Sequence, residues 1–251
     1  MDTTTLSGRT ALVTGASKGI GARIAIELAA AGASVIVNYR TDQAGAERVV
    51  KQITEAGGRA LPVGADVARS GDVASLFTTA RQAFGPVDVL VNNAGVVEFL
   101  PLGAYTEEQY RRTTDTNFWG PMLTMQALVG QSDVGAASII NVSTAGTTTL
   151  PAYASLYVAT KAALNAATVI AAKELGPRGI RVNAIAPGVS DTEGTRAMGF
   201  VGSPLAEQAV TEIPLGRLGR PDDYGPVVVF LASEAARWIT GAIVHVSGGQ
   251  R

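Results

Sequence analysis

Cysteine is absent from this 251-residue sequence, and histidine occurs once, as His245. The chain therefore contains no disulfide, thiolate nucleophile or zinc–thiolate site, and one histidine cannot build a multi-histidine site, so we expect no metal centre. An excess of charge of one sign is also missing, because 20 Lys and Arg residues face 21 Asp and Glu residues, for a net charge of −1. Blocks of like charge do not occur, which argues against nucleic acid as a partner.

Long hydrophobic runs are missing as well. The longest, such as residues 227–232, are far shorter than the roughly 20 residues of a membrane span, and residues 1–10 lack the charged and apolar segments of a signal peptide. We therefore expect a cytoplasmic protein without a membrane partner. With 47% hydrophobic residues and 29 glycines, the chain is long enough for one large domain with a sizeable core.

Short β-branched runs alternate with longer alanine-rich segments of helical spacing. We expect strands at 10–14, 34–39, 60–65, 87–92, 138–142, 181–185 and 242–246. We expect helices near 19–31, 42–56, 70–84, 106–129, 155–175 and 221–232. This alternation predicts βαβ units around a parallel sheet with both faces covered, in a single α/β domain over residues 1–251. Residues 189–215 interrupt the alternation, and we interpret them as a mobile lid, the alternative being a disordered loop.

The first expected strand leads directly into Thr-Gly-Ala-Ser-Lys-Gly-Ile-Gly at residues 14–21, and a helical segment follows. Glycines let a backbone approach a pyrophosphate closely, and the start of a helix offers free N–H groups and a positive dipole end. The spacing G-x-x-x-G-x-G differs from the usual G-x-G-x-x-G, and a glycine-rich chain produces such triplets by chance. Its position between a strand and a helix favours a nucleotide site over a plain turn.

The end of the second expected strand distinguishes the two nicotinamide cofactors. NAD sites carry an acidic residue there for the ribose hydroxyls, whereas this strand ends Asn38-Tyr39-Arg40 and the first acid, Asp42, lies beyond it. Arg40 and Lys18 place positive charge where a 2′-phosphate would lie, and a guanidinium can pair with phosphate bidentately. We predict NADP(H) over NAD(H), the alternative being that Arg40 is a solvated turn residue.

Tyr157 and Lys161 are four residues apart in a segment of strong helix formers, so they share one helix face. A phenol has an ordinary pKa of about 10, and a neighbouring ammonium lowers that pKa towards the range useful for proton transfer. On spacing alone, an ordinary solvated pair is the commoner case. The pair becomes a candidate for catalysis only in combination with the other motifs.

Taken in order along the chain, the motifs resemble those of the short-chain dehydrogenase/reductase family. The matching features are residues 14–21, Asp66-Val67, Asn92-Asn93-Ala94-Gly95, Asn117, Ser143-Thr144, Tyr157-x-x-x-Lys161, Pro187-Gly188 and the segment 214–241. The resemblance covers roughly residues 6–249. It implies a doubly wound Rossmann fold with about seven parallel strands, and an NADP(H)-dependent oxidoreductase that interconverts a ketone or aldehyde and an alcohol.

The resemblance also implies a role for each matching position. The phosphates and adenosine ribose would be bound by Gly15, Ser17, Lys18, Gly19, Ile20 and Gly21. The adenine would meet Asp66 and Val67, while Asn92, Ala94 and Gly95 would support the adenine-side ribose and the fourth strand. The nicotinamide side would be lined by Pro187, Gly188, Val189 and Thr192. Tyr157 would be the general acid or base, Lys161 would bind the nicotinamide ribose and lower the tyrosine pKa, and Asn117 would anchor a relay water.

Two positions depart from the family pattern. The family's carbonyl-binding serine lies thirteen residues before the tyrosine, and here that position is Thr144, with Ser143 one residue earlier. We favour Thr144 by this count, while a one-residue shift of the loop would return the role to Ser143. Ser247-Gly248-Gly249 stands where the family often has Asp-Gly-Gly, near the usual subunit interfaces.

The substrate and the assembly are less readable. Apolar residues expected near the site are Val97, Phe99, Leu100, Tyr153, Met198 and Phe200. They suggest a hydrophobic substrate, although ordinary packing explains them equally well. The resemblance implies a 3-oxoacyl thioester reductase or a secondary-alcohol or sugar dehydrogenase, and a homotetramer paired through the alanine-rich helix after Tyr157. A protein that binds NADP(H) as a sensor or scaffold without turnover is the alternative.

Overall fold

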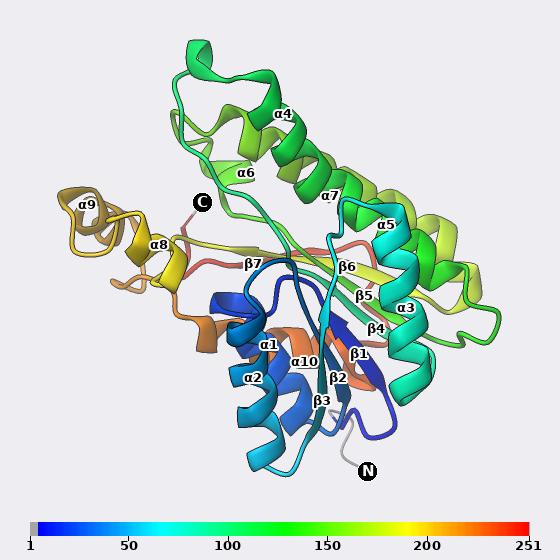
Figure 1. Cartoon of the computed structure of the whole chain (residues 1–251). Coiled ribbons are helices and arrows are strands. Elements are labelled where there is room, and N and C mark those ends of the chain that lie inside the picture. Colours follow the sequence, from blue (N-terminus) through cyan, green and yellow to red (C-terminus); the bar gives the residue numbers. More distant parts are fainter. Residues whose placement is uncertain (1–4, 251) are drawn as a thin grey trace.

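A computed structural model describes residues 5–250 as seven parallel strands between two layers of helices (Figure 1). Residues 1–4 and 251 lie outside the described part. The expectation of no signal peptide concerns residues 1–10, so its first four residues are outside the described part as well. The strands are β1 (Thr10–Val13), β2 (Ser34–Tyr39), β3 (Arg59–Gly64), β4 (Val89–Asn92), β5 (Ser138–Val142), β6 (Arg181–Pro187) and β7 (Ile243–Val246). The predicted seven-stranded parallel sheet is confirmed.

The strand order is β3-β2-β1-β4-β5-β6-β7, with every neighbouring pair parallel. The order reverses between β1 and β4, so the connections that leave these two strands diverge. In doubly wound sheets, ligands bind at the carboxyl ends of the strands on either side of such a reversal. The topology therefore places the candidate site where β1 and β4 end.

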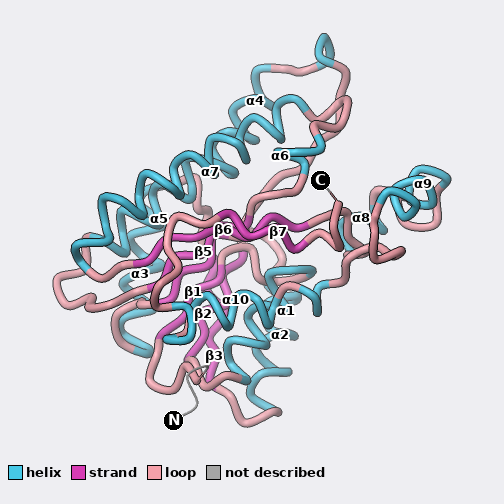
Figure 2. The backbone as a smooth tube through the Cα atoms, turned by 180° about the vertical axis from the view of Figure 1, so that it is seen from behind, coloured by secondary structure: helices cyan, strands magenta, loops and turns pink. Residues whose placement is uncertain are grey.

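Successive side chains of each strand point to opposite faces of the sheet, where they pack into two separate hydrophobic cores. On one face, Val13 and its neighbours pack against α1 (Gly19–Ala30), α2 (Gln43–Glu55) and α10 (Gly225–Ala232). On the other face, Leu12 joins the core beneath α3 (Ser70–Phe84), α5 (Gly120–Val129) and α7 (Ser155–Leu175). Figures 1 and 2 show the two helix layers on opposite sides of the sheet.

The helix expected over 106–129 has three successive parts without a gap between them. These parts are α4 (Glu107–Thr114), one turn of π-helix over Asp115–Trp119, and α5. Gly120 opens α5 in close contact with Val67, where a Cβ would lie 2.9 Å from the valine Cγ2, and Pro121 lacks an N–H for the helix ladder. The predicted helix is therefore present over Glu107–Val129, but its centre is a π-turn, whose extra residue carries Asn117 inward.

The segment 189–215 is also more regular than predicted. It contains α8 (Glu193–Ala197) and α9 (Pro204–Glu212), which project from the body of the molecule at the same end as α6 (Gly146–Thr149) and the start of α4 (Figures 1 and 2). The Thr192 side chain caps α8 by accepting from the Thr195 N–H, and Ser203 caps α9 in the same manner from Ala206. The disordered loop is therefore not what the structure shows, and the lid remains a prediction.

One described segment, Ser155–Arg178, is long and apolar enough to cross a membrane by length and composition. It comprises α7 and the turn after it, and it packs along β6. Lys161, near its start, is buried. Its apolar face is therefore used in the core beneath the sheet.

Candidate active site at the carboxyl ends of the strands

The glycine loop after β1 is locked to the loop after β4. The Asn93 side chain donates to the carbonyls of Thr14 and Gly15, both at 2.9 Å, and the Thr14 hydroxyl accepts from the N–H groups of Asn93 and Ala94. A Cβ on Gly15 would lie 2.8 Å from the Ala94 Cα, and Gly15 has a φ of +60°. Glycine is therefore required there by the packing of the two loops as well as by any phosphate.

The start of α1 already holds an anionic group. Gly19 has a φ of +60°, and its N–H donates to the Glu193 carboxylate of α8 at 2.8 Å. The N-terminus of a helix favours negative charge because its N–H groups are free and the dipole is positive there. Lys18 and Arg40 flank this loop as exposed side chains, and neither forms an ion pair with any residue in the range 5–250.

Two predicted cofactor residues have their side chains turned into the protein. The Asn92 amide donates to Asn141 at 2.9 Å and its oxygen accepts from Thr124 at 2.6 Å, so a direct contact of this side chain with a ribose is not supported. It supports β4 instead, as the resemblance also implied. Val67 is 5% exposed and packs on Gly120, so its side chain is likewise unavailable to an adenine. Asp66 remains partly exposed, and its carboxylate accepts from the Ala68 N–H.

Tyr157 and Lys161 lie one turn apart near the start of α7. Burial lowers the pKa of Lys161 to about 8, and its Nζ donates to the Val142 carbonyl at 2.8 Å. Burial raises the pKa of the Tyr157 phenol above its usual value, and a hydrogen bond with Thr144 partly offsets this. The predicted lowering of the tyrosine pKa by Lys161 is therefore not found, because burial dominates and disfavours charge on both groups.

Thr144 and Ser143 have different surroundings. The Thr144 hydroxyl accepts from the Gly146 N–H at 3.1 Å and lies near enough to the Tyr157 phenol to lower its pKa. Ser143 is 3% exposed, and its hydroxyl has no hydrogen-bond partner in the described part of the chain. The position beside the phenol is thus occupied by Thr144, in agreement with the count of thirteen residues.

Asn117 joins the tyrosine helix to the loop after β4. Its amide oxygen accepts from the Val96 N–H at 2.7 Å, and its nitrogen donates to the Val96 carbonyl and to the Thr160 hydroxyl. A Cβ on Gly95 would lie 3.4 Å from the Asn117 oxygen and 3.6 Å from the Lys161 Nζ. The structure therefore brings Gly95, Asn117 and Lys161 together, and the Asn117 side chain holds the Val96 backbone.

The turn after β6 closes the other side of the site. The Pro187 carbonyl accepts from the Ala145 N–H at 2.8 Å, and Gly188 is so close to Ser247 that a Cβ would lie 2.9 Å from its Cα. Thr192 lies against the glycine loop, since a Cβ placed on Gly19 would be 3.9 Å from the Thr192 Cβ. The four residues predicted for the nicotinamide side thus follow one another along this edge.

Comparison with known proteins identifies the family. A family model described as enoyl-(acyl carrier protein) reductase matches residues 15–251. An uncharacterized oxidoreductase of Methylorubrum extorquens is 50% identical over 246 residues, covering 98% of this chain and 99% of the relative. The 3-oxoacyl-acyl-carrier-protein reductase FabG of Staphylococcus aureus is 41% identical over 243 residues, or 96% of this chain and 97% of its own. The chain belongs to the short-chain dehydrogenase/reductase family.

Solved structures of this family share the whole fold. A dehydrogenase/reductase of Sinorhizobium meliloti has a TM-score of 0.94 at 35% identity, covering 99% of this chain and 97% of its own. A blue fluorescent protein from a metagenomic library, solved in complex with NADPH, has a TM-score of 0.90 at 36% identity, with 97% and 98% covered. As a member of the short-chain dehydrogenase/reductase family, the protein is an oxidoreductase.

Two residues of this short-chain dehydrogenase/reductase were missed by sequence reasoning. Asn93 stands inside a recognised motif and, rather than Asn92, it ties the glycine loop down. Glu193 gave no signal, because its contact with Gly19 spans 174 residues and only the folded chain brings them together.

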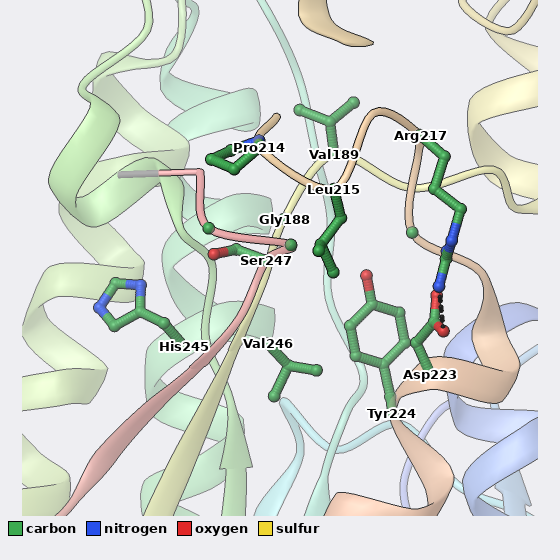
Figure 3. Close-up of a pocket in the computed structure, with 13 residues that line it drawn as sticks. Gly188, Val189, Pro214, Leu215, Arg217, Asp223, Tyr224, His245, Val246 and Ser247 are labelled. Atoms are coloured by element: carbon green, nitrogen blue, oxygen red, sulfur yellow. Dashed lines mark hydrogen bonds and ion pairs between the residues drawn. The ribbon is translucent and has the colours of Figure 1, made fainter. Parts of the chain in front are cut away.

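A cavity of about 530 Å³ lies behind the Gly188 turn (Figure 3). Its lining includes Val189, Leu215, Tyr224 and His245, and an ion pair joins Arg217 and Asp223 at its side. Tyr157 is not among the lining residues, so this cavity adjoins the expected nicotinamide side without containing the phenol.

Proposed function

We propose that the protein uses NADP(H) to interconvert a ketone or aldehyde and the corresponding alcohol, with Tyr157 as the acid or base. The observation that carries this proposal is the Thr144 hydroxyl beside the Tyr157 phenol, with buried Lys161 one turn further on α7. In the reducing direction, Thr144 and Tyr157 donate hydrogen bonds to the substrate carbonyl oxygen, and Tyr157 gives up its proton as negative charge develops there. Lys161 stabilises the resulting phenolate.

The residues of the chain fit the proposed cofactor. The Gly19 N–H binds a carboxylate, which shows that the start of α1 accepts an anionic oxygen, and Lys18 and Arg40 are free to bind a 2′-phosphate. When bound, NADPH supplies the hydride. Lys161 would hold its ribose, Pro187 to Thr192 would face its nicotinamide, and α8 and α9 would close over the substrate as a lid. Bound NADP in a neighbouring structure, the angucycline ketoreductase LanV, 38% identical with a TM-score of 0.90, supports the preference for NADP(H).

The first test is oxidation of NADPH and NADH with a panel of carbonyl compounds. We expect turnover with NADPH favoured, and we expect Tyr157→Phe to lose several orders of magnitude in kcat while the NADPH Kd changes less than about twofold, because the hydroxyl acts in the chemical step. Arg40→Ala should weaken NADPH binding but not NADH binding, with Arg48→Ala on α2 as its control.

The outcomes separate the alternatives. Retained activity in Tyr157→Phe would contradict the mechanism, and equal Kd values for NADPH and NADH would contradict the cofactor preference. Tight NADPH binding without turnover of any carbonyl compound would favour the sensor or scaffold.

We also propose a cytoplasmic homotetramer. Along α7, Ala162, Ala166 and Ile170 are exposed at intervals of four residues, so one face of the helix is free of contacts with the chain's own sheet. Small side chains on such a face permit another helix to approach closely. This supports pairing of two chains through α7.

A further inference from the structure

The segment 95–100 runs beside the candidate catalytic turn of α7. At one end, Gly95 lies next to the Lys161 Nζ, and Val96 is held by Asn117. At the other end, the Leu100 N–H donates to the Tyr153 carbonyl at 2.7 Å. Tyr157 lies midway in sequence between these two anchors. The segment therefore passes close to the proposed reaction centre.

Exposure alternates along this segment as in a strand, although no ladder is formed. Val97 and Phe99 are 38% and 53% exposed, while Val96 and Leu100 are partly buried. Glu98 points to the other side, where it pairs with Arg112 of α4. Val97 and Phe99 thus lie on the opposite side of the segment from the ion pair and present exposed apolar side chains.

Tyr153 extends this apolar surface. Its φ of +66° is uncommon for a residue with a side chain, and it persists because the Tyr153 carbonyl accepts from both the Leu100 N–H and the Tyr105 hydroxyl. The Tyr153 side chain is 63% exposed in spite of this fixed backbone. We call Val97, Phe99 and Tyr153 the aromatic rim.

Apart from the buried Lys161, the surroundings of the aromatic rim lack free positive charge. Segments 93–115, 143–160 and 188–212 contain three cationic residues, Arg111, Arg112 and Arg196. Each of these arginines is ion-paired within the described chain, with Glu107, Glu98 and Asp191 respectively. Phosphate groups and acidic protein surfaces are bound by cations that can pair with them. Here the three guanidiniums already pair with carboxylates of the chain itself.

From the apolar surface and the paired arginines, we propose that the substrate is a neutral ketone with a flat aromatic body, and not an acyl thioester carried on coenzyme A or on an acidic carrier protein. This inference rests on the proposed function. An aromatic body can stack on or edge against Phe99 and Tyr153, a contact that an aliphatic ring makes less well. In the reaction, the ketone gains a hydride at carbon and the Tyr157 proton at oxygen, giving a secondary alcohol while NADPH becomes NADP⁺.

The test compares kcat/KM for 2-tetralone, cyclohexanone and acetoacetyl coenzyme A with NADPH. We expect 2-tetralone to exceed cyclohexanone by roughly tenfold or more, since an aromatic contact contributes about that much to affinity. We expect acetoacetyl coenzyme A to be the poorest of the three. A higher kcat/KM for acetoacetyl coenzyme A would overturn the substrate class and leave the proposed reaction standing, whereas no turnover with any carbonyl compound overturns both.

Variants of the aromatic rim give a second readout. Phe99→Ala and Tyr153→Asn should each raise KM for 2-tetralone by roughly tenfold, with kcat, KM for cyclohexanone and the NADPH Kd nearly unchanged. Asparagine is chosen because it tolerates positive φ. Phe230→Ala on α10, another exposed phenylalanine, is the matched control and should change none of these values. Equal effects on 2-tetralone and cyclohexanone would show that the rim does not select the aromatic body.

Discussion

Buried Lys161 makes the stability of the fold depend on pH. Its pKa is lowered to about 8 in the folded chain, against 10.5 for a free lysine, because burial disfavours the ammonium. Between these two values the unfolded chain binds more protons than the folded chain, so the free energy of unfolding rises with pH. Below pH 8 both states are protonated, and the penalty for burying the charge is fully present.

We therefore expect the wild-type chain to gain about 2 kcal/mol over Lys161→Met between pH 7 and pH 9.5. Urea unfolding of both proteins across this range measures the difference, and the comparison cancels the other titrating groups. A difference that stays constant with pH would mean that the ammonium of Lys161 is not disfavoured in the fold.

Thr144 and Ser143 should behave oppositely on substitution. Thr144→Val removes the hydroxyl beside the Tyr157 phenol, and we expect kcat to fall about a hundredfold, as when a donor to a developing oxyanion is lost. Ser143→Ala removes a buried hydroxyl without a described partner, so activity and stability should be retained. Steady-state kinetics and thermal unfolding check both, and the reverse pattern would assign the carbonyl contact to Ser143.

At the scale of elements, α8 and the start of α1 are joined by one carboxylate. Glu193 occupies the Gly19 N–H, a group that the cofactor pyrophosphate would also use, and two anions cannot share it. We expect Glu193→Gln to tighten NADPH binding roughly fivefold, because the competing negative charge is removed. Fluorescence titration measures the Kd. Glu207→Gln on α9 is the control, and an equal gain in both variants would point to a general charge effect.

The bounds of the helices and strands show how much of the fold the sequence could predict. The bounds of β2, β5, α3 and α7 agree with the predicted segments, because their apolar periodicity ends at clear polar or glycine boundaries. The π-turn between α4 and α5 was not predictable, since it depends on Gly120 meeting Val67 and on Asn117 reaching Val96. The motif residues around Tyr157 were found, but local spacing could not show that burial raises the pKa of the tyrosine and that Thr144 is the group that opposes this.

At the scale of the whole molecule, the exposed face of α7 predicts the assembly. We expect light scattering at micromolar concentration to give roughly four times the chain mass of 25.7 kDa. Ala166→Arg should reduce this mass, because a long charged side chain prevents close approach of two helices. Ala74→Arg on α3, which replaces another exposed alanine, is the matched control. A wild-type mass near that of one chain would refute the tetramer.

The Asn92 side chain, which supports β4, also belongs to a longer chain of hydrogen bonds. From Thr124 on α5 it runs through Asn92 and Asn141 to Thr168 on α7, and all four side chains are buried. If α7 separated from the sheet, these polar groups would lose their partners together, so partial opening there is costly. The backbone amides of β4, β5 and central α7 should therefore exchange with deuterium only when the entire domain unfolds. The α8–α9 segment lies outside this network, so we expect its amides to exchange faster than those of β4 and β5.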